Sequence, residues 1–231
     1  AHGQPVPEDG YHGGYIVDLA AQILSENPHI VDLPEAEQLV EFRELAYALQ
    51  LDQQQRVLEL FRTHFDVWSS ERGLHESGAV PKAMSRLREQ GHIYESDGAV
   101  WLRTSTFGDD KDRVLIKADG ELTYFASDTA YYLDKRTRGF DTAIYLLGAD
   151  HHGYVNRLRA VAACAGDNPD VNVEILIGQL VKMMKAGAEV RLSKRAGNII
   201  SLEDLVDEVG VDAARYSLIR YPVESPLVLD L

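Results

Sequence analysis

Apolar residues in the first third of the chain recur with the spacing of amphipathic helices. They appear at every third or fourth position from Tyr15 to Leu24, and the same spacing continues over residues 35–51, 53–65 and 79–90. Residues 66–70 are expected to form a short strand, and residues 92–102 a hairpin that turns at Asp97-Gly98. The first 105 residues are therefore expected to form a mostly helical module with one hairpin.

After residue 105 the pattern changes to short apolar runs separated by helical segments. Residues 113–117 and 122–125 flank Asp119-Gly120 and predict a second hairpin, followed by a helix over 127–135. The run 142–147 is typical of a buried parallel strand, and 173–177 is expected to be the next strand, with helical spacing between them over 154–165. Strand, helix and strand in this order predict a right-handed βαβ unit. Two helices, over 203–209 and 212–219, close the sequence, and Ser201 is expected to cap the first.

Composition narrows the class of protein. The 231 residues are 45% hydrophobic and 26% charged, which is ordinary for a soluble globular protein. No apolar run approaches the ~20 residues that span a membrane, and the first residues lack the features of a signal peptide. The single cysteine, Cys164, excludes an internal disulfide and is expected in the core, so a cytoplasmic location is expected.

The net charge of −14 argues against broad wrapping of nucleic acid, and no DNA partner is expected. Charge is uneven, however, because residues 181–195 carry five Lys and Arg against one acid. Within this basic segment, after an expected hairpin, residues 190–197 read Val-Arg-Leu-Ser-Lys-Arg-Ala-Gly. Cations, a hydroxyl and a glycine on one loop suit a triphosphate. Taken alone, the same pattern also fits a charged surface turn.

Two further segments carry candidate chemistry. Tyr124 and Asp128 lie four residues apart, at the expected end of a strand and first turn of a helix. The carboxylate could pair with a guanidinium and the ring could stack on it. Taken alone, however, the two residues fit a helix-capping Asp and a half-buried Tyr better. Residues 148–152, Gly-Ala-Asp-His-His, follow the strand expected to end at 147, where open α/β sheets bind ligands. Adjacent histidines rarely converge on one metal, so no metal site is expected here.

In this order, the segments resemble bacterial-type arginyl-tRNA synthetases, which are class I enzymes. The resemblance is carried as well by residues 11–16, 70–79, 108–115 and 210–216. It implies an α/β fold: the second half of a Rossmann-like parallel sheet with a mostly helical inserted module. Residues 1–105 would be the inserted module and residues 106–205 the second half of the nucleotide-binding catalytic domain. Residues 206–231 would begin a helical stem that leads to an anticodon-binding domain.

The resemblance also implies roles for individual residues. Tyr124, Asp128 and His151 would contact L-arginine, while Gly148, Asp150, Lys194 and Arg195 would bind ATP. Residues 191–195 resemble the second class I signature, usually Lys-Met-Ser-Lys-Ser. Arg191, Ser193 and Lys194 would then be catalytic, with Lys194 stabilising charge at the α-phosphate. The chain departs from the signature at its first, second and last positions, which leaves the relative roles of Arg191 and Lys194 open.

The activity implied is that of an arginine–tRNA ligase. L-Arginine and ATP, with Mg²⁺, would give arginyl-adenylate and then arginyl-tRNA-Arg, and we expect a monomer with no membrane partner. The first class I signature, His-x-Gly-His, does not occur in the sequence. We therefore expect a middle section of a synthetase, inactive alone. The alternative is a non-catalytic arginine- and nucleotide-binding module, and the ordered matches disfavour an unrelated nucleotidyltransferase.

Overall fold

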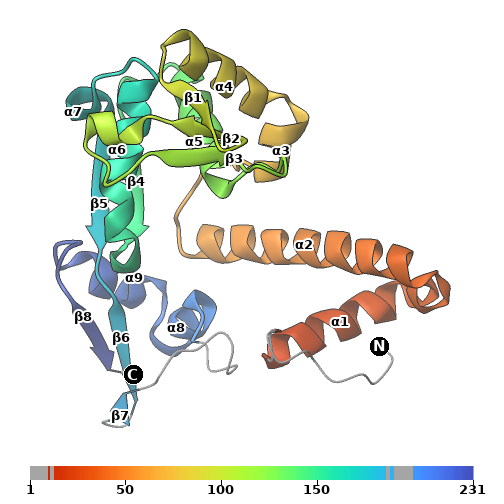
Figure 1. The fold of residues 1–231 in the computed structure, drawn as a ribbon. Coiled ribbons are helices and arrows are strands. Elements are labelled where there is room, and N and C mark those ends of the chain that lie inside the picture. The colour runs from red at the N-terminus through yellow and green to blue at the C-terminus, as the bar shows by residue number, and fades with distance from the viewer. Residues whose placement is uncertain (1–9, 11–12, 186–187, 190–199, 231) are drawn as a thin grey trace. The chain divides into compact units, whose positions relative to one another are not determined.

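The structure is a computed structural model that describes residues 10, 13–185, 188–189 and 200–230 (Figure 1). The chain divides into two compact units, each built from segments distant in sequence. Unit 1 comprises residues 1–66, 181–221 and 227–231, and unit 2 comprises residues 67–180 and 222–226. The chain thus leaves unit 1 after Asp66 and returns to it at Val181, and each unit is described by itself below.

Unit 1 begins with helix α1 (Gly14–Glu26), the short 3₁₀ helix η1 (Pro28–Asp32) and helix α2 (Glu35–Leu60). The expected helix at 15–24 is confirmed. The prediction of two separate helices over 35–51 and 53–65 was wrong, because the chain forms one continuous helix of 26 residues there. No Pro or Gly interrupts the junction, and Asp52 pairs across it with Arg56 at 2.9 Å, so nothing ends the first helix.

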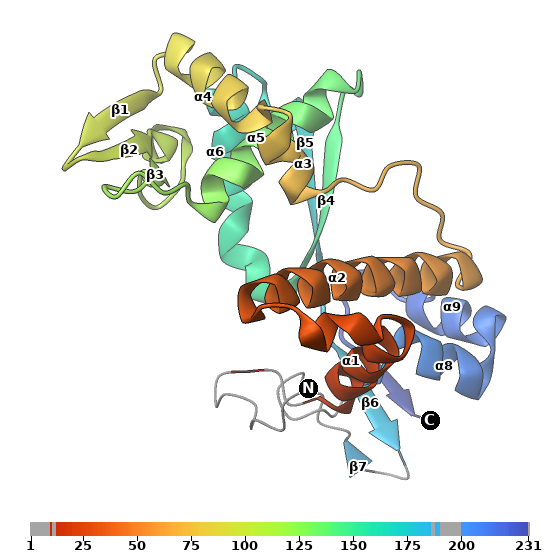
Figure 2. The same ribbon diagram turned by 90° about the vertical axis from the view of Figure 1, so that its right-hand side faces the viewer.

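The rest of unit 1 is a small sheet with two helices. Strand β6 (Val181–Lys185) pairs antiparallel with β7 (Ala188–Glu189), which confirms the hairpin, and parallel with the unpredicted β8 (Leu227–Asp230). Helices α8 (Leu202–Val209) and α9 (Val211–Ile219) confirm the two closing helices and lie side by side (Figure 2). Ser201 caps α8 through a capping box with Asp204. Arg215 of α9 donates to the carbonyl of Phe61 at 2.6 Å, which ties α9 to the end of α2.

Unit 2 opens with two helices and an antiparallel sheet. Helix α3 (Glu71–Glu76) precedes α4 (Ala79–Glu89), and the strands are β1 (Ile93–Ser96), β2 (Ala99–Leu102) and β3 (Arg113–Ile116), with the 3₁₀ helix η2 (Thr104–Phe107) between the last two. The predicted helix at 79–90 and the turn at Asp97-Gly98 are confirmed, with φ of 52° and 76° at the two turn residues. The strand expected at 66–70 was wrong, because Ser70 caps α3 instead.

The second predicted hairpin is only partly present. Its far arm makes a single bridge, Ile116 to Leu122, before helix α5 (Tyr124–Thr137) begins. The helix begins before the predicted residue 127 because Thr123 caps it. The Thr123 hydroxyl accepts a hydrogen bond from the Ala126 backbone N–H and donates one to the Val114 carbonyl at 2.8 Å. The expected helix start at 127 was therefore wrong, and Asp128 lies in the second turn of α5 rather than the first.

The βαβ unit completes unit 2. Strand β4 (Ala143–Gly148) leads through the 3₁₀ helix η3 (Ala149–Tyr154) into α6 (Val155–Cys164), and the short α7 (Pro169–Asn172) precedes β5 (Val173–Gly178). The two strands pair in parallel, as expected. The expectation that 142–147 is buried was wrong for one face, where Ile144 and Leu146 are 58% and 73% exposed. Only the opposite face of β4 packs on the core of the unit.

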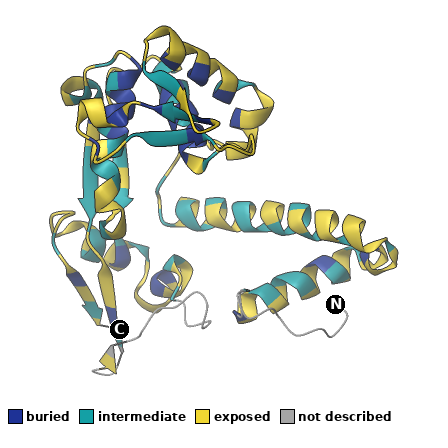
Figure 3. Ribbon diagram, in the orientation of Figure 1, coloured by how far each residue is buried: buried dark blue, intermediate teal, exposed yellow. Residues whose placement is uncertain are grey.

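The core of unit 2 lies between α4, α5, α6 and the sheets, as the buried positions in Figure 3 show. Its fully buried side chains include Leu87, Leu102, Leu115 and Tyr132. Cys164 is also fully buried, which confirms its expected place in the core. Among the residues that the structure describes, no helix is long and apolar enough to cross a membrane.

Candidate functional site

The carboxyl end of β4 carries the first group of candidate residues. Gly148 is the last residue of β4, and Asp150 and His151 follow directly on η3. A Cβ at Gly148 would lie 2.6 Å from Asp150 Oδ1, so glycine is needed for the Asp150 side chain to fold back over the strand end. Asp150 and His151 face each other at 3.7 Å, and both side chains are exposed to solvent. These polar groups therefore stand where open α/β sheets bind ligands.

Helix α5 carries the second group. Tyr124 and Asp128 lie one turn apart on it, but their surroundings differ. Tyr124 is 84% exposed, whereas Asp128 is half-buried and accepts a hydrogen bond from the Tyr154 hydroxyl at 2.5 Å. The bond occupies Oδ2 of Asp128. A carboxylate held in this way is oriented to receive a second, cationic donor on its remaining lone pairs.

Tyr154, which the sequence did not single out, joins the two groups. Its ring lies edge-on to His151 at 6.4 Å between centroids, and the Arg157 guanidinium lies 4.2 Å above it. Burial, and then the hydrogen bond to Asp128, raise the pKa of Tyr154, so the phenol stays protonated and donates at neutral pH. Tyr154 thus contacts His151 through its ring and Asp128 through its hydroxyl, although 26 residues separate it from Asp128 in the sequence.

Two buried side-chain polar atoms in unit 2 have no hydrogen-bond partner among the described residues. They are the hydroxyl of Tyr145 on β4 and Nε of Arg157 on α6. The ammonium of Lys135 lies 4.0 Å over the Tyr145 ring and 3.9 Å over the Tyr131 ring. Burial, and then the charge of Arg138, lower the pKa of Lys135 to about 8. Donors with unused hydrogen-bonding capacity are the groups that position a polar ligand.

A hollow of about 470 Å³ opens beside η3, within the usual size range of small-molecule sites. Arg113 stands on its wall, held by Asp109 through hydrogen bonds of 2.7 and 2.8 Å and by a short contact to Asp110. The hollow is lined by Asp109, Asp110, Arg113, Asp150, His151, Gly153, Tyr154, Asn156 and Arg157. It therefore brings together two of the predicted residues, Asp150 and His151. Tyr124, Asp128 and Gly148 do not line it.

The predicted phosphate loop cannot be placed in this geometry. Arg191, Ser193, Lys194 and Arg195 lie outside the described residues. Within the described ranges, no group of three or more His, Cys, Asp or Glu side chains is arranged to hold a metal ion. The described part of the site is thus a half-buried carboxylate, a protonated phenol and an exposed Asp–His pair at one strand end.

Sequence relatives identify the family. The protein-family model for tRNA synthetases class I (R), catalytic domain, matches residues 29–220. The arginine–tRNA ligases of Frankia alni and Pseudarthrobacter chlorophenolicus are each 57% identical to the chain, over 231 and 229 residues. The alignments cover 100% and 99% of this chain but 42% and 41% of the relatives. The chain therefore spans less than half the length of these curated relatives.

Solved structures agree with the sequence relatives. An arginyl-tRNA synthetase structure from Campylobacter jejuni matches with a TM-score of 0.87 and 35% identity, covering 98% of this chain and 49% of that one. Thermus thermophilus arginyl-tRNA synthetase matches with a TM-score of 0.65 at 18% identity, over 93% and 46% of the two chains, and supports the fold alone. The α/β fold with a helical module is confirmed. Because the family model matches well over half of its residues, the chain belongs to the class I tRNA synthetases of the arginine type, within their catalytic domain.

Proposed function

We propose that this chain supplies the arginine-binding residues and part of the ATP-binding residues of an arginine–tRNA ligase. The ligase joins L-arginine to ATP as arginyl-adenylate and then transfers the arginyl group to tRNA-Arg. The observation that carries the proposal is the Asp128 carboxylate, half-buried and oriented by the Tyr154 hydroxyl at 2.5 Å. A fixed carboxylate beside aromatic rings is the chemistry that selects a planar guanidinium.

In the arginine site, each residue has a separate role. Asp128 accepts hydrogen bonds from the guanidinium. Because Tyr154 already holds the carboxylate, the Asp128 side chain loses little conformational entropy when arginine binds. Tyr124 is exposed one turn earlier on α5 and its ring is free to close over the ligand. His151, edge-on to Tyr154, contacts the polar backbone end of arginine.

In the ATP site, Gly148 and Asp150 bind the nucleoside. Asp150 is largely exposed, so its side chain can turn from Gly148 towards a ribose hydroxyl and leave the glycine open to the adenosine. Arg191, Ser193, Lys194 and Arg195 are proposed from the signature alone to hold the phosphates, with Lys194 stabilising charge at the α-phosphate. Mg²⁺ would be bound to the ATP phosphates and offset part of their charge.

The proposal also includes the division of the chain into domains, its location and its oligomeric state. We keep 1–105 as the inserted module, 106–205 as the second half of the catalytic domain and 206–231 as the start of a helical stem. A cytoplasmic location fits the single buried cysteine. A monomer stays part of the proposal. The competing proposal, a non-catalytic module that binds arginine and nucleotide, uses the same described residues and is separated from the first by the experiment below.

The test combines binding and charging. The chain is assayed alone and also joined to the remaining length of the Frankia alni relative. In both forms Asp128→Asn is compared with the matched control Asp134→Asn, whose carboxylate pairs with Arg138 at the end of the same helix. We expect Asp128→Asn to weaken arginine binding at least about tenfold, the effect of one lost charge-assisted interaction, with ATP binding unchanged. Equal arginine affinity in the two variants would remove Asp128 from the site. Arginine binding without charging in the joined protein would favour the non-catalytic module.

A further inference from the structure

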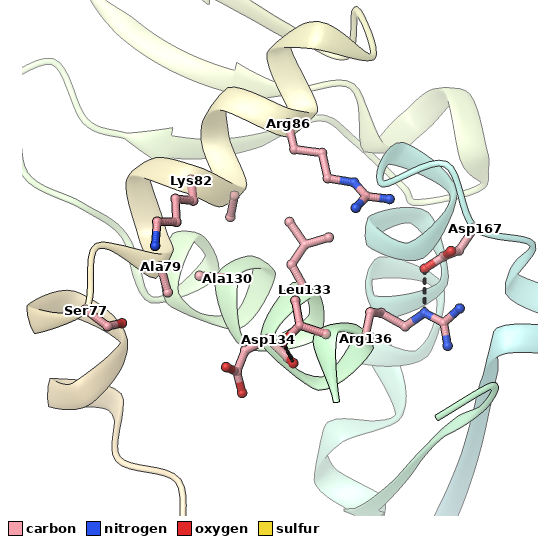
Figure 4. A pocket seen from close by; sticks show the side chains of 11 residues that line it. Ser77, Ala79, Lys82, Arg86, Ala130, Leu133, Asp134, Arg136 and Asp167 are labelled. Carbon is pink, nitrogen blue, oxygen red and sulfur yellow. Dashed lines mark hydrogen bonds and ion pairs between the residues drawn. The ribbon is translucent and has the colours of Figure 1, made fainter. Parts of the chain in front are cut away.

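Another half-buried carboxylate of unit 2 receives a tyrosine hydroxyl, as Asp128 does, and it also pairs with an arginine. Asp167 accepts two hydrogen bonds on Oδ2, from the Tyr132 hydroxyl at 2.6 Å and from Arg136 Nε at 2.9 Å. Figure 4 shows the bond between Arg136 and Asp167, beside a hollow of about 580 Å³ between α4 and α5. A phenol and a guanidinium thus share one carboxylate inside this unit.

The same kinds of group surround Asp128 in a different arrangement. The Tyr154 hydroxyl donates to Oδ2 of Asp128 at 2.5 Å. The neighbouring guanidinium, that of Arg157 on α6, lies 4.2 Å over the Tyr154 ring instead of pairing with the carboxylate. It also lies 6.0 Å over the ring of Phe125, which is buried. The chain therefore holds Asp128 by its phenol alone and leaves Oδ1 able to accept from a ligand.

The placement of Arg157 is not explained by stability alone. Its Nε is buried and has no hydrogen-bond acceptor among the described residues, which costs folding free energy. The attraction between the cation and the two rings offsets part of that cost. A guanidinium stacked on a phenol ring restricts the rotation of that ring, so the gain from this arrangement is a fixed Tyr154 side chain.

The charge of Arg157 also acts on the Tyr154 hydroxyl. Burial, and then the hydrogen bond to Asp128, raise the pKa of Tyr154, and the positive charge of Arg157 acts in the opposite direction. A neighbouring cation draws electron density from the phenol oxygen, which makes the hydroxyl a stronger hydrogen-bond donor. Arg157 therefore strengthens the bond that orients Asp128.

We propose that Arg157 is a positioning residue for arginine recognition and that it acts through Tyr154. Its guanidinium fixes the Tyr154 ring, the Tyr154 hydroxyl holds Oδ2 of Asp128, and Oδ1 faces the guanidinium of the amino acid. This role rests on the proposed function, in which Asp128 binds that guanidinium. With L-arginine bound, Asp128 has the two kinds of partner that Asp167 has within the chain, a phenol and a guanidinium.

A direct contact with a ligand is the alternative role for Arg157, since the residue also lines the hollow beside η3. Tyr154→Phe separates the two roles, because it removes the hydroxyl and keeps a ring under the guanidinium. If Arg157 acts through the Tyr154 hydroxyl, replacing Arg157 has no further effect once the hydroxyl is gone. A direct contact would add its full loss to that of Tyr154→Phe.

The experiment is a double-mutant cycle with Arg157→Met and Tyr154→Phe in the chain joined to the remaining length of the Frankia alni relative. Binding of L-arginine and of ATP is measured by titration calorimetry. We expect each single variant to weaken L-arginine binding about fivefold to tenfold, the effect of one hydrogen bond to a carboxylate. The double variant should lose no more than the weaker single variant, and ATP affinity should not change.

Arg103→Met is the matched control, because it removes a guanidinium from a similar arrangement. The Arg103 guanidinium lies 4.4 Å over the Tyr94 ring, and the Tyr94 hydroxyl donates to Asp112 at 2.9 Å. Here the second carboxylate oxygen, Oδ1, already accepts from the Ser105 hydroxyl at 2.6 Å. Arg103→Met should therefore leave L-arginine affinity unchanged, even where it lowers the urea midpoint of unit 2.

Three results would overturn the positioning role: additive losses in the double variant, an equal loss in Arg103→Met, or full L-arginine affinity in Arg157→Met. If Arg157→Met does not fold, Arg157→Lys takes its place in the cycle, because it keeps the charge and loses the planar group, and additive losses would again count against the role. Unchanged affinity in Asp128→Asn would defeat the proposed function itself. A loss in Asp128→Asn with none at Arg157 would defeat only the positioning role.

Discussion

The ion pair between Asp109 and Arg113 permits a quantitative test of how unit 2 is held together. The Asp109 side chain is 1% exposed and that of Arg113 is 14% exposed. The guanidinium donates two hydrogen bonds to the carboxylate, and the Asp110 backbone N–H donates a third at 2.9 Å. Although burial opposes ionisation, these hydrogen bonds hold the pKa of Asp109 well below its ordinary value. Asp109 is therefore ionised throughout the neutral range.

The perturbation is Arg113→Met, which removes the guanidinium and keeps a flexible apolar stem. The buried Asp109 carboxylate then loses both hydrogen bonds from the guanidinium and keeps the one from the Asp110 backbone N–H. Breaking a buried pair on one side costs about 3–5 kcal/mol of folding free energy. A typical domain has only about 5–15 kcal/mol in total, so the loss is a large share of the stability. Replacing both partners, as Arg113→Met with Asp109→Leu, should recover most of it, because no charge is then buried unpaired.

The assay is urea unfolding at neutral pH, followed by tryptophan fluorescence. Both tryptophans, Trp68 and Trp101, belong to unit 2 and report on it. Lys117→Met is the matched control, because Lys117 pairs with Glu121 at 2.6 Å in the same unit with both side chains exposed. This variant should leave the urea midpoint unchanged.

The dependence on pH follows from the lowered pKa of Asp109. Its contribution to stability is complete above the ordinary carboxyl pKa of 3.8 and is lost as the pH falls below that value towards the folded-state pKa. This acid-dependent loss should be smaller in Arg113→Met. A loss of less than about 1 kcal/mol in Arg113→Met at neutral pH would refute the reasoning, because Asp109 would then be hydrated rather than buried.

Three further predictions concern single residues. Ser201→Ala should lower the stability of unit 1 by about 1 kcal/mol through loss of the α8 cap, as measured by urea unfolding followed by circular dichroism, whereas Ser201→Asp should retain the cap. Burial, and then the negative charge of Asp112, raise the pKa of the Cys164 thiol to about 12, so iodoacetamide should alkylate it only after unfolding. Rapid labelling of the native chain, measured by mass spectrometry, would contradict the burial of this thiol. Lys135, with its pKa lowered to about 8, should titrate by NMR well below the exposed lysines, and a midpoint near that of Lys117 would place its ammonium in water.

Local sequence was sufficient for elements whose signals lie within a few residues. The apolar spacing of 79–90 and 154–165 predicted α4 and α6, Asp97-Gly98 predicted a turn that needs positive φ, and Ser201 predicted a cap. The order of the motifs was sufficient to recognise the family, because a long ordered match has few alternative explanations. The same reasoning selected Asp128 and His151 as site candidates, although it placed Asp128 in the wrong turn.

Helix and strand boundaries were decided partly by residues outside the local pattern. The periodicity of α2 did not show that two helical stretches would join, because each satisfied the same spacing. Helix α5 starts at Tyr124 because Thr123 reaches back to the Val114 carbonyl, nine residues earlier in the chain. Burial of one face of β4 depended in the same way on which layers cover the sheet, and the apolar run alone could not distinguish its two faces.

The sequence by itself therefore determined the fold class, most of the elements and the family, since spacing and motif order can be read along the chain without knowing which residues meet. The tertiary structure alone decided which distant side chains meet. It set Tyr154 against Asp128, across 26 residues, and placed Arg86 on the Ala165 carbonyl, across 79. Such contacts depend on how helices and strands pack, and packing is set by shape, burial and charge over a whole unit. No short stretch of sequence contains that information.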